Sequence, residues 1–199
     1  MSWPVEIRGV TESVVTTLGP NGRWNVAALG LHADGGKGDG AEAADGARPV
    51  RARTWGRTRT WRNFTERGAG YVQFTRDPVD FTEAALAVRE EDDPVLDSAD
   101  AWVRAGVERV GEGVEGGTEW VDWHLHPEEA AVERAVVPTT NRGYGAVVEA
   151  TVAASRLGVE AYDADELRER LDYFAGVIER CGGPREREAL ARMRELVEW

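Results

Sequence analysis

The chain has few of the features that mark a secreted or membrane protein. Cys181 is the single cysteine among 199 residues, so an intramolecular disulfide is impossible. No apolar run approaches the roughly 20 residues that a membrane-spanning helix needs, and the first residues lack the basic region and apolar core of a secretory signal. A chain of this length can bury a core without disulfides or metals. These absences predict a soluble protein of the reducing cytoplasm, with no membrane partner.

Lysine is almost absent as well. Lys37 is the only one, and 24 Lys and Arg residues face 36 Asp and Glu residues, which gives a formal net charge of −12. An excess of acid with arginine in place of lysine is typical of a salt-rich cytoplasm and favours a haloarchaeal origin. A GC-rich genome is the alternative, because it favours Arg, Ala, Gly and Val codons. Whichever origin holds, a net charge of −12 argues against nucleic-acid binding, which needs clustered positive charge.

Most of the chain has the patterns of β-strands. Residues 13–30 hold two β-type runs around Gly-Pro-Asn-Gly, where Asn-Gly supplies the positive φ angles of a tight turn. Alternating or β-branched residues predict further strands, at 50–60, 70–75, 120–126, 133–138 and 145–156. The last of these fits a helix equally well, and residues 99–109 fit either a helix or a loop with a strand.

Helical signals appear at three places. Residues 78–88 have helical spacing after an acidic start, and residues 63–68 predict a short helical turn that ends at a glycine. Near the C-terminus, Asp163 caps one predicted helix. A Gly-Gly-Pro connection follows, with Pro184 as the first residue of a second helix, as in an αα-hairpin.

The order of these elements predicts a mainly β fold with α (α+β), namely a β-barrel with a C-terminal helical hairpin. We expect the barrel in residues 1–160 and the hairpin, packed on it, in residues 161–199. Residues 34–49 form a Gly/Ala/Asp-rich stretch without an apolar period, so they are expected to be a mobile, exposed insertion between strands. A lid over a site is the less favoured interpretation of this insertion.

A basic loop has the chemistry of an anion cradle. Arg57, Thr58, Arg59 and Thr60 offer two guanidinium groups and two hydroxyls at the end of a predicted strand, just before the helical turn that begins near Asn63. Hydroxyls, guanidinium groups and free amides at a helix start suit a phosphate monoester. The alternative is a solvated strand end with alternating basic side chains.

Two further segments fit a nucleotide-type ligand. The small residues of the strand 25–30 leave room for a flat ring against the backbone, and Asn25 offers a side-chain amide at the ring edge. In the loop 139–145, Asn141 and Arg142 are placed to bind a phosphate or a ribityl chain. The alternatives are an ordinary barrel strand and a hairpin loop that uses Asn and Gly for its turn.

Other candidate chemistry is weaker. His124 and His126 share one face of a predicted strand, and Glu128 and Glu129 follow them, as zinc or iron ligands would. The sequence places no third strong ligand, so we expect histidines that face solvent or a subunit contact, and no metal site. No catalytic side chain is predicted, because Gly-x-Ser-x-Gly is absent. The formal G-x-G-x-x-G at 111–116 carries acids where a pyrophosphate would lie.

Four segments, in their order and spacing, resemble the DUF447 family. They read ESVVTT at 12–17, NVAALG at 25–30, RTRTWRN at 57–63 and NRGYGAVVEA at 141–150. The resemblance covers nearly the whole chain, including the C-terminal helical pair. Members are mainly archaeal and are related in fold to the flavin-reductase-like and pyridoxamine-oxidase-like FMN-binding split barrels.

The resemblance implies a split β-barrel homodimer with FMN at the subunit interface. The basic loop matches the family's phosphate loop, and the strand 25–28 matches the strand along the ring. Either subunit can supply the Asn-Arg pair at 141 and 142. The cofactor-binding residues implied are Thr16, Thr17, Asn25, Val26, Ala27, Ala28, Arg57, Thr58, Thr60, Asn63, Asn141 and Arg142.

FMN would make the protein a flavin-dependent reductase or oxidase of a small molecule. The flavin performs hydride transfer in such proteins, so no side-chain acid or base is required. A non-catalytic flavin-binding module and a protein that binds the deazaflavin F420 are the alternatives. The insertion at 34–49 and the acidic surface depart from the family pattern and leave access to the substrate face open.

Overall fold

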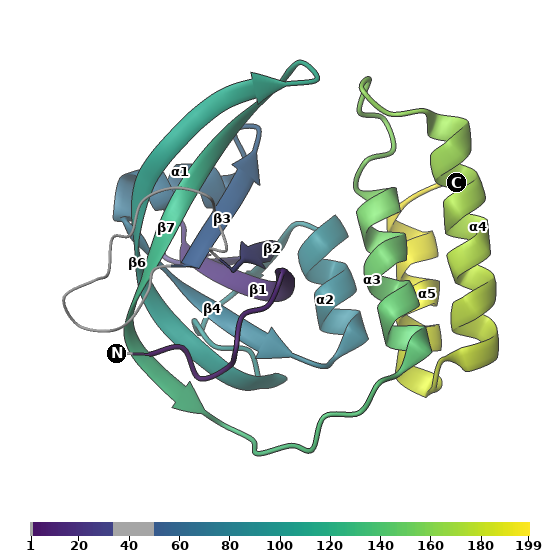
Figure 1. Ribbon diagram of the computed structural model, residues 1–199, viewed down its shortest axis with the longest axis horizontal. Helices are drawn as coiled ribbons and strands as arrows, with labels where there is room; N and C mark the ends of the chain where they lie inside the picture. The colour runs from purple at the N-terminus through teal and green to yellow at the C-terminus, as the bar shows by residue number, and fades with distance from the viewer. Residues whose placement is uncertain (1, 34–49) are drawn as a thin grey trace. The chain divides into compact units, whose positions relative to one another are not determined.

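The computed structural model describes residues 2–33 and 50–199 of the chain. Two units are present, Met1–Thr75 with Glu90–Ala135 and Arg76–Arg89 with Val136–Trp199. The first contains the β-barrel and helix α1, and the second contains helices α2 to α5 (Figure 1). The insertion expected at 34–49 lies outside the described residues.

The strands of the first unit form a closed antiparallel barrel. Around it lie β1 (Val10–Leu18), β4 (Ala69–Thr75), β6 (Ala99–Glu115), β7 (Thr118–Val132), β3 (Val50–Trp55) and β2 (Trp24–His32). A second pairing of β2 with β1 closes the ring, and the short β5 (Arg89–Glu91) pairs with β2. The α+β barrel predicted from the sequence is confirmed.

The hairpin β1–β2 follows directly from its turn residues. Leu18 pairs with Trp24, and across the turn Gly19 N donates to the Arg23 carbonyl at 2.8 Å. Gly22 has a φ of +78°, a conformation that a residue with a Cβ rarely adopts. The predicted hairpin is therefore confirmed, with its register fixed by the turn.

The basic loop begins a helix earlier than expected. β3 ends at Trp55 rather than at residue 60, because Gly56 turns the chain with a φ of +66°. Helix α1 (Arg59–Arg67) replaces the predicted short turn at 63–68. The Thr58 side chain caps this helix, and Gly68, at a φ of +67°, ends it.

The long hairpin β6–β7 resolves the ambiguity at 99–109, which is strand throughout. Gly116 and Gly117 make its turn with φ angles of +55° and +79°. The strand predicted at 133–138 is wrong, because β7 ends at Val132. Its partner β6 begins at Ala99, and Ala101 already pairs with Val132. Residues beyond 132 therefore have almost no β6 backbone with which to form further ladder hydrogen bonds.

Alternation along β7 separates the barrel core from its outer surface. Val121, Trp123 and Leu125 are buried with residues of the other strands, and the Phe64 ring of α1 meets the Trp123 ring edge-on at 5.4 Å. The intervening residues face outward, and they are Trp120, Asp122, His124 and His126. One strand therefore supplies both the core and a polar outer face.

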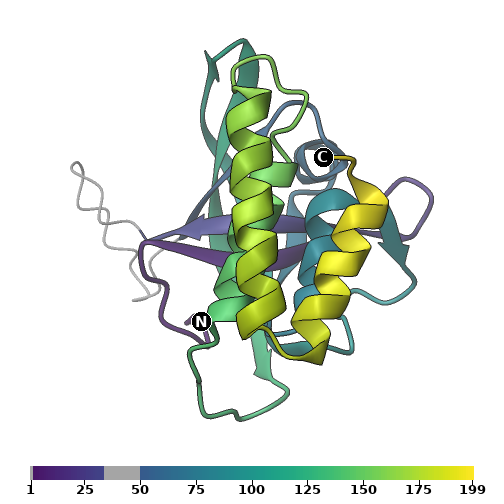
Figure 2. The same ribbon diagram turned by 90° about the vertical axis from the view of Figure 1, so that its right-hand side faces the viewer.

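The second unit is a set of capped helices. They are α2 (Pro78–Leu86), α3 (Arg142–Ala154), α4 (Ala164–Cys181) and α5 (Pro184–Leu196). Asp77, Asn141 and Asp163 accept backbone N–H bonds at the starts of α2, α3 and α4, and Pro184 opens α5. The predicted C-terminal hairpin is confirmed as α4 and α5, which run side by side in Figure 2.

Helix α3 corrects the strand predicted at 145–156. Its small residues recur with helical spacing, so the helix approaches its neighbours closely. A Cβ on Gly143 would lie 2.4 Å from the Gly182 Cα, just after α4. Because α3 packs with α4 and α5, the barrel unit ends at Ala135 instead of at the expected residue 160.

Apolar side chains of all four helices meet in one core. Leu171, Ile178 and Met193 are fully buried there, and Val79 and Leu86 of α2 pack against the same cluster. Among the described residues, no helix combines the length and the apolar character needed to cross a membrane.

Candidate functional site

The basic loop between β3 and α1 is held by local interactions. Thr58 Oγ1 accepts a hydrogen bond from Trp61 N at 3.2 Å, which fixes the first turn of α1. The Arg57 guanidinium lies 5.8 Å from the centre of the Trp61 ring and donates to the Glu119 carboxylate at 3.0 Å. Arg59 pairs with Glu90 at 2.7 Å and so points to a different carboxylate. The loop therefore separates its two predicted anion ligands.

A pocket of about 200 Å³ opens beside Arg57. The loop before α1 and the tip of the β6–β7 hairpin form it, within the barrel unit. Its lining residues are Gly56, Arg57, Trp61, Arg109, Glu112, Gly113, Val114, Glu119, Trp120 and Val121. Guanidinium groups, carboxylates and indole rings thus meet at one place.

The indole ring of Trp120 forms one wall of this pocket. A Cβ added to Gly113 would lie 2.6 Å from a ring atom, so only glycine lets the ring lie this close to the β6 backbone. The Arg53 guanidinium carbon lies 3.9 Å from the centre of the Trp120 ring, a cation–π contact. These two contacts hold the ring in place from both strands that flank it.

A partly buried ion pair fixes that arginine. Arg53 donates from Nε and Nη2 to the two carboxylate oxygens of Asp122 at 2.7 and 2.9 Å, and Arg51 adds a third bond at 3.2 Å. The hydrogen bonds from Arg53 hold the pKa of Asp122 below its usual value, against the opposing effect of burial. The carboxylate therefore stays ionised and anchors the wall of the pocket.

Five polar residues among the predicted site residues are buried, and they include two hydrogen-bonded pairs. Asn63 Nδ2 donates to Thr17 Oγ1 at 2.9 Å, and Asn25 Nδ2 donates to Thr60 Oγ1 at 3.4 Å. These bonds tie helix α1 to the hairpin β1–β2. The fifth residue, Thr16, accepts a bond from Gln73 Nε2 at 3.1 Å and donates to the Pro94 carbonyl.

One atom of this polar layer has no partner. The Oδ1 atom of Asn63 is buried and accepts no hydrogen bond in the part of the chain that the structure describes. An unsatisfied buried acceptor costs stability unless a donor reaches it.

Val26, Ala27 and Ala28 lie on the neighbouring strand β2, where Ala27 pairs with Val15 and packs against the barrel core.

Asn141 and Arg142 have a different place from the one expected. They belong to the helical unit, where Asn141 caps α3 instead of lying in a loop between two strands. Its Oδ1 accepts from Gly143 N at 2.7 Å, and its Nδ2 donates to Glu186 at 3.1 Å. The structure thus gives Asn141 a capping role; its contact with a cofactor stays a prediction.

Sequence reasoning missed Trp120, Arg109 and Gly113 as parts of the pocket. The alternation in 120–126 marks Trp120 as outward-facing, which is the one signal that was available. Trp120, Arg109 and Gly113 lie near Arg57 because Trp55 of β3 pairs with Trp120 of β7. Strand pairing over such a separation along the chain leaves no local trace.

The closed barrel together with the helical unit places the protein in the class of split-barrel proteins. Two family models match the chain. The first, the N-terminal domain of DUF447 (a protein of unknown function), matches residues 11–134, and the second, DUF447 (a protein of unknown function), matches residues 141–195. The chain therefore belongs to the DUF447 family, as its motifs predict.

Solved structures with the same fold include an FMN-bound DUF447 protein from Methanosarcina mazei. It is 22% identical to this chain, the match covers 96% of each chain, and the TM-score is 0.77. The styrene monooxygenase flavin reductase from Pseudomonas putida also matches, at 13% identity over 62% of this chain and 79% of that one. Its TM-score is 0.40.

Proposed function

We propose that this protein binds FMN as a homodimer and uses it as an oxidoreductase of a small molecule. The observation that carries the proposal is the FMN-bound DUF447 protein, which shares the fold over 96% of the chain. The pocket beside the basic loop is the proposed place of contact. Bound FMN would supply hydride transfer, while the chain supplies position and electrostatics.

The chemistry of the pocket fits such a group. Arg57 and Arg109 offer guanidinium donors, which suit a phosphate, and the faces of Trp61 and Trp120 suit a planar ring. Both arginines now pair with carboxylates of the hairpin tip, Glu119 and Glu112. A phosphate would compete with these exposed pairs, which contribute little to stability.

The size of the pocket supports a shared site. Its volume of about 200 Å³ is smaller than the roughly 300–1,000 Å³ of a typical small-molecule site. One chain would therefore enclose only part of a cofactor, and a second subunit would cover the rest. The buried layer of Thr17, Asn25, Thr60 and Asn63 would hold the loop in position behind the site.

Titration of the purified protein with FMN, followed by absorbance and fluorescence, tests the proposal. It is best done at both low and high salt because of the net charge of −12. The variant Arg57→Ala loses a charged hydrogen-bond donor worth about 1.5–3 kcal/mol, so its Kd should rise about 10- to 150-fold. Arg62→Ala is the matched control, since Arg62 is an exposed arginine of helix α1, five residues further along the chain, and does not line the pocket.

Mass spectrometry of the ligand released on unfolding separates the cofactors. FMN supports the proposal, whereas F420 would move the protein to deazaflavin chemistry. Reduction of the bound flavin by NADH, NADPH or reduced deazaflavin tests the oxidoreductase, and light scattering tests the dimer. Protein that binds neither cofactor at either salt concentration would refute the proposed function.

A further inference from the structure

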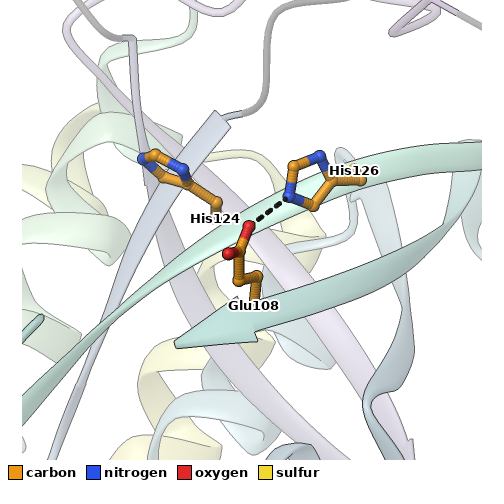
Figure 3. Close-up of side chains that lie close together, drawn as sticks. All are labelled: Glu108, His124 and His126. Carbon is orange, nitrogen blue, oxygen red and sulfur yellow. Dashed lines mark hydrogen bonds and ion pairs between the residues drawn. The ribbon is translucent and has the colours of Figure 1, made fainter. Parts of the chain in front are cut away.

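Three side chains that can ligate a metal meet on the outer face of the hairpin β6–β7. Glu108 lies on β6, and His124 and His126 lie two residues apart on β7. One ligand atom from each lies within 4.8 Å of the other two, and Figure 3 shows the carboxylate between the two imidazole rings. All three belong to the barrel unit and lie outside the pocket beside Arg57.

A β-bulge places the carboxylate in this trio. The pairing of β6 with β7 shifts by one residue between Arg109 and Gly111, so Glu108 lies opposite His124. Without the shift, the register of the hairpin turn would place Glu108 opposite Leu125, whose side chain points into the core. The bulge therefore brings the acid onto the face that carries the histidines.

The distances suit a small divalent ion. His126 Nε2 and Glu108 Oε2 are 3.2 Å apart, and two ligand atoms bound tetrahedrally at about 2.0–2.1 Å would be separated by about 3.3–3.4 Å. The distances from the His124 ligand atom to those of Glu108 and His126 are at most 4.8 Å. They need to shorten by no more than about 1.4 Å to reach the tetrahedral separation. The side chains of His126 and Glu108 are 49% and 65% exposed, so rotation of the two can achieve this.

The neighbouring charges permit a cation here. Arg51 pairs with His124 across β3 and β7, but its guanidinium is bonded to Asp122. Glu128, which the sequence offered as a ligand, is instead bonded to Arg104. The one carboxylate in the trio thus comes from the neighbouring strand, which sequence spacing could not show.

We infer that Glu108, His124 and His126 form a binding site for a divalent transition-metal ion of the zinc type. Two imidazole nitrogens and one carboxylate oxygen suit Zn²⁺, Co²⁺, Ni²⁺ or Cu²⁺, whereas Mg²⁺ and Ca²⁺ prefer oxygen ligands. Three protein ligands leave at least one position on the solvent side for water or for a ligand from another molecule. The inference does not depend on the proposed flavin function.

Titration with Zn²⁺ against a chromophoric chelator tests this site on the full chain without a polyhistidine tag. Millimolar Mg²⁺ in the buffer occupies oxygen-only sites among the acidic residues but competes poorly for imidazole. We expect one strong Zn²⁺ equivalent per chain, weakened on acidification because metal competes with protons for the ring nitrogens. Co²⁺ in the same site should give visible d–d absorption that added Zn²⁺ removes.

The variants His126→Gln and Glu108→Gln should each weaken Zn²⁺ binding by more than about tenfold. Loss of a residue that only supports a metal ligand already costs about tenfold or more in affinity, and loss of a ligand should cost more than that. His32→Gln is the matched control. His32 is the third histidine of the chain and pairs with Arg51, so it lies in the same row of the sheet but two strands from His124. Circular dichroism verifies that each variant folds.

Two results would overturn the inference. One is the absence of a strong Zn²⁺ equivalent in the wild-type chain. The other is a folded His126→Gln variant that binds Zn²⁺ as tightly as the wild-type and His32→Gln chains, since the metal would then be held elsewhere.

Discussion

Replacement of Asp122 by asparagine should destabilise the barrel in a pH-dependent way. The Asp122 side chain is 11% exposed and that of Arg53 is 24% exposed, so solvent screens this ion pair only weakly. Asp122→Asn keeps the shape of the side chain but removes the charge and one of the two acceptors that Arg53 uses. The guanidinium would be left half-paired over the Trp120 ring.

The magnitude follows from these contacts. Breaking a fully buried pair costs about 3–5 kcal/mol, and a hydrogen bond to a charged group contributes about 1.5–3 kcal/mol. Because Arg53 keeps one acceptor and its contact with Trp120, we expect a loss of about 2 kcal/mol at pH 7. For a chain of this size that corresponds to a fall in Tm of about 4–8 °C.

The sign of the pH dependence is set by the lowered pKa of Asp122. A carboxyl whose pKa is lower in the folded state stabilises the fold above the pKa of the unfolded state. That contribution disappears as the pH falls through the folded-state pKa. The difference between wild type and Asp122→Asn should therefore be constant from pH 8 to about pH 5 and shrink below about pH 4.

Urea denaturation at several pH values measures this difference. Glu115→Gln is the control, because Glu115 lies 3.9 Å from the same arginine but is 70% exposed. It should change stability by less than about 0.5 kcal/mol. An Asp122→Asn variant as stable as wild type at pH 7, or a difference that grows on acidification, would refute the reasoning.

Three further substitutions probe packing and capping. Gly143→Ala would drive a Cβ to 2.4 Å from the Gly182 Cα, so a loss of about 2–3 kcal/mol in chemical denaturation is expected, and a neutral result would contradict this approach. Leu171→Ala empties a fully buried position and should cost about 2–5 kcal/mol; a cost below 1 kcal/mol would place Leu171 outside the helical core. Thr58→Ala removes the acceptor for Trp61 N and should cost about 1 kcal/mol, with faster amide exchange only in the first turn of α1.

Local chemistry made part of the fold predictable. The first hairpin and the C-terminal helices were found from the sequence because their signals act within a few residues. These signals are the turn Gly19–Gly22, the N-cap Asp163 and Pro184 as the first residue of α5. Helix α3 was not, because its Val, Ala and Thr residues suit a strand as well. Only packing against α4 decides between the two.

The candidate site was predictable only where its residues are contiguous in the sequence. The sequence identified Arg57 and its loop, but the tip residues Gly113 and Trp120 join it through strand pairings across the barrel. Glu108 and His124 meet because of a one-residue bulge. A shift of one residue reverses which face a side chain occupies, and composition does not record it.

Helix α2 belongs to the second unit but lies in the sequence between strands β4 and β6 of the first. During synthesis it therefore leaves the ribosome well before α3, α4 and α5. Its apolar residues Val79 and Leu86 must wait for their partners in the helical core until these three helices have been synthesised. A fragment that starts at α3 would lack these side chains and leave apolar surface open to aggregation. The position of α2 in the sequence thus links completion of the helical core to translation of α3, α4 and α5.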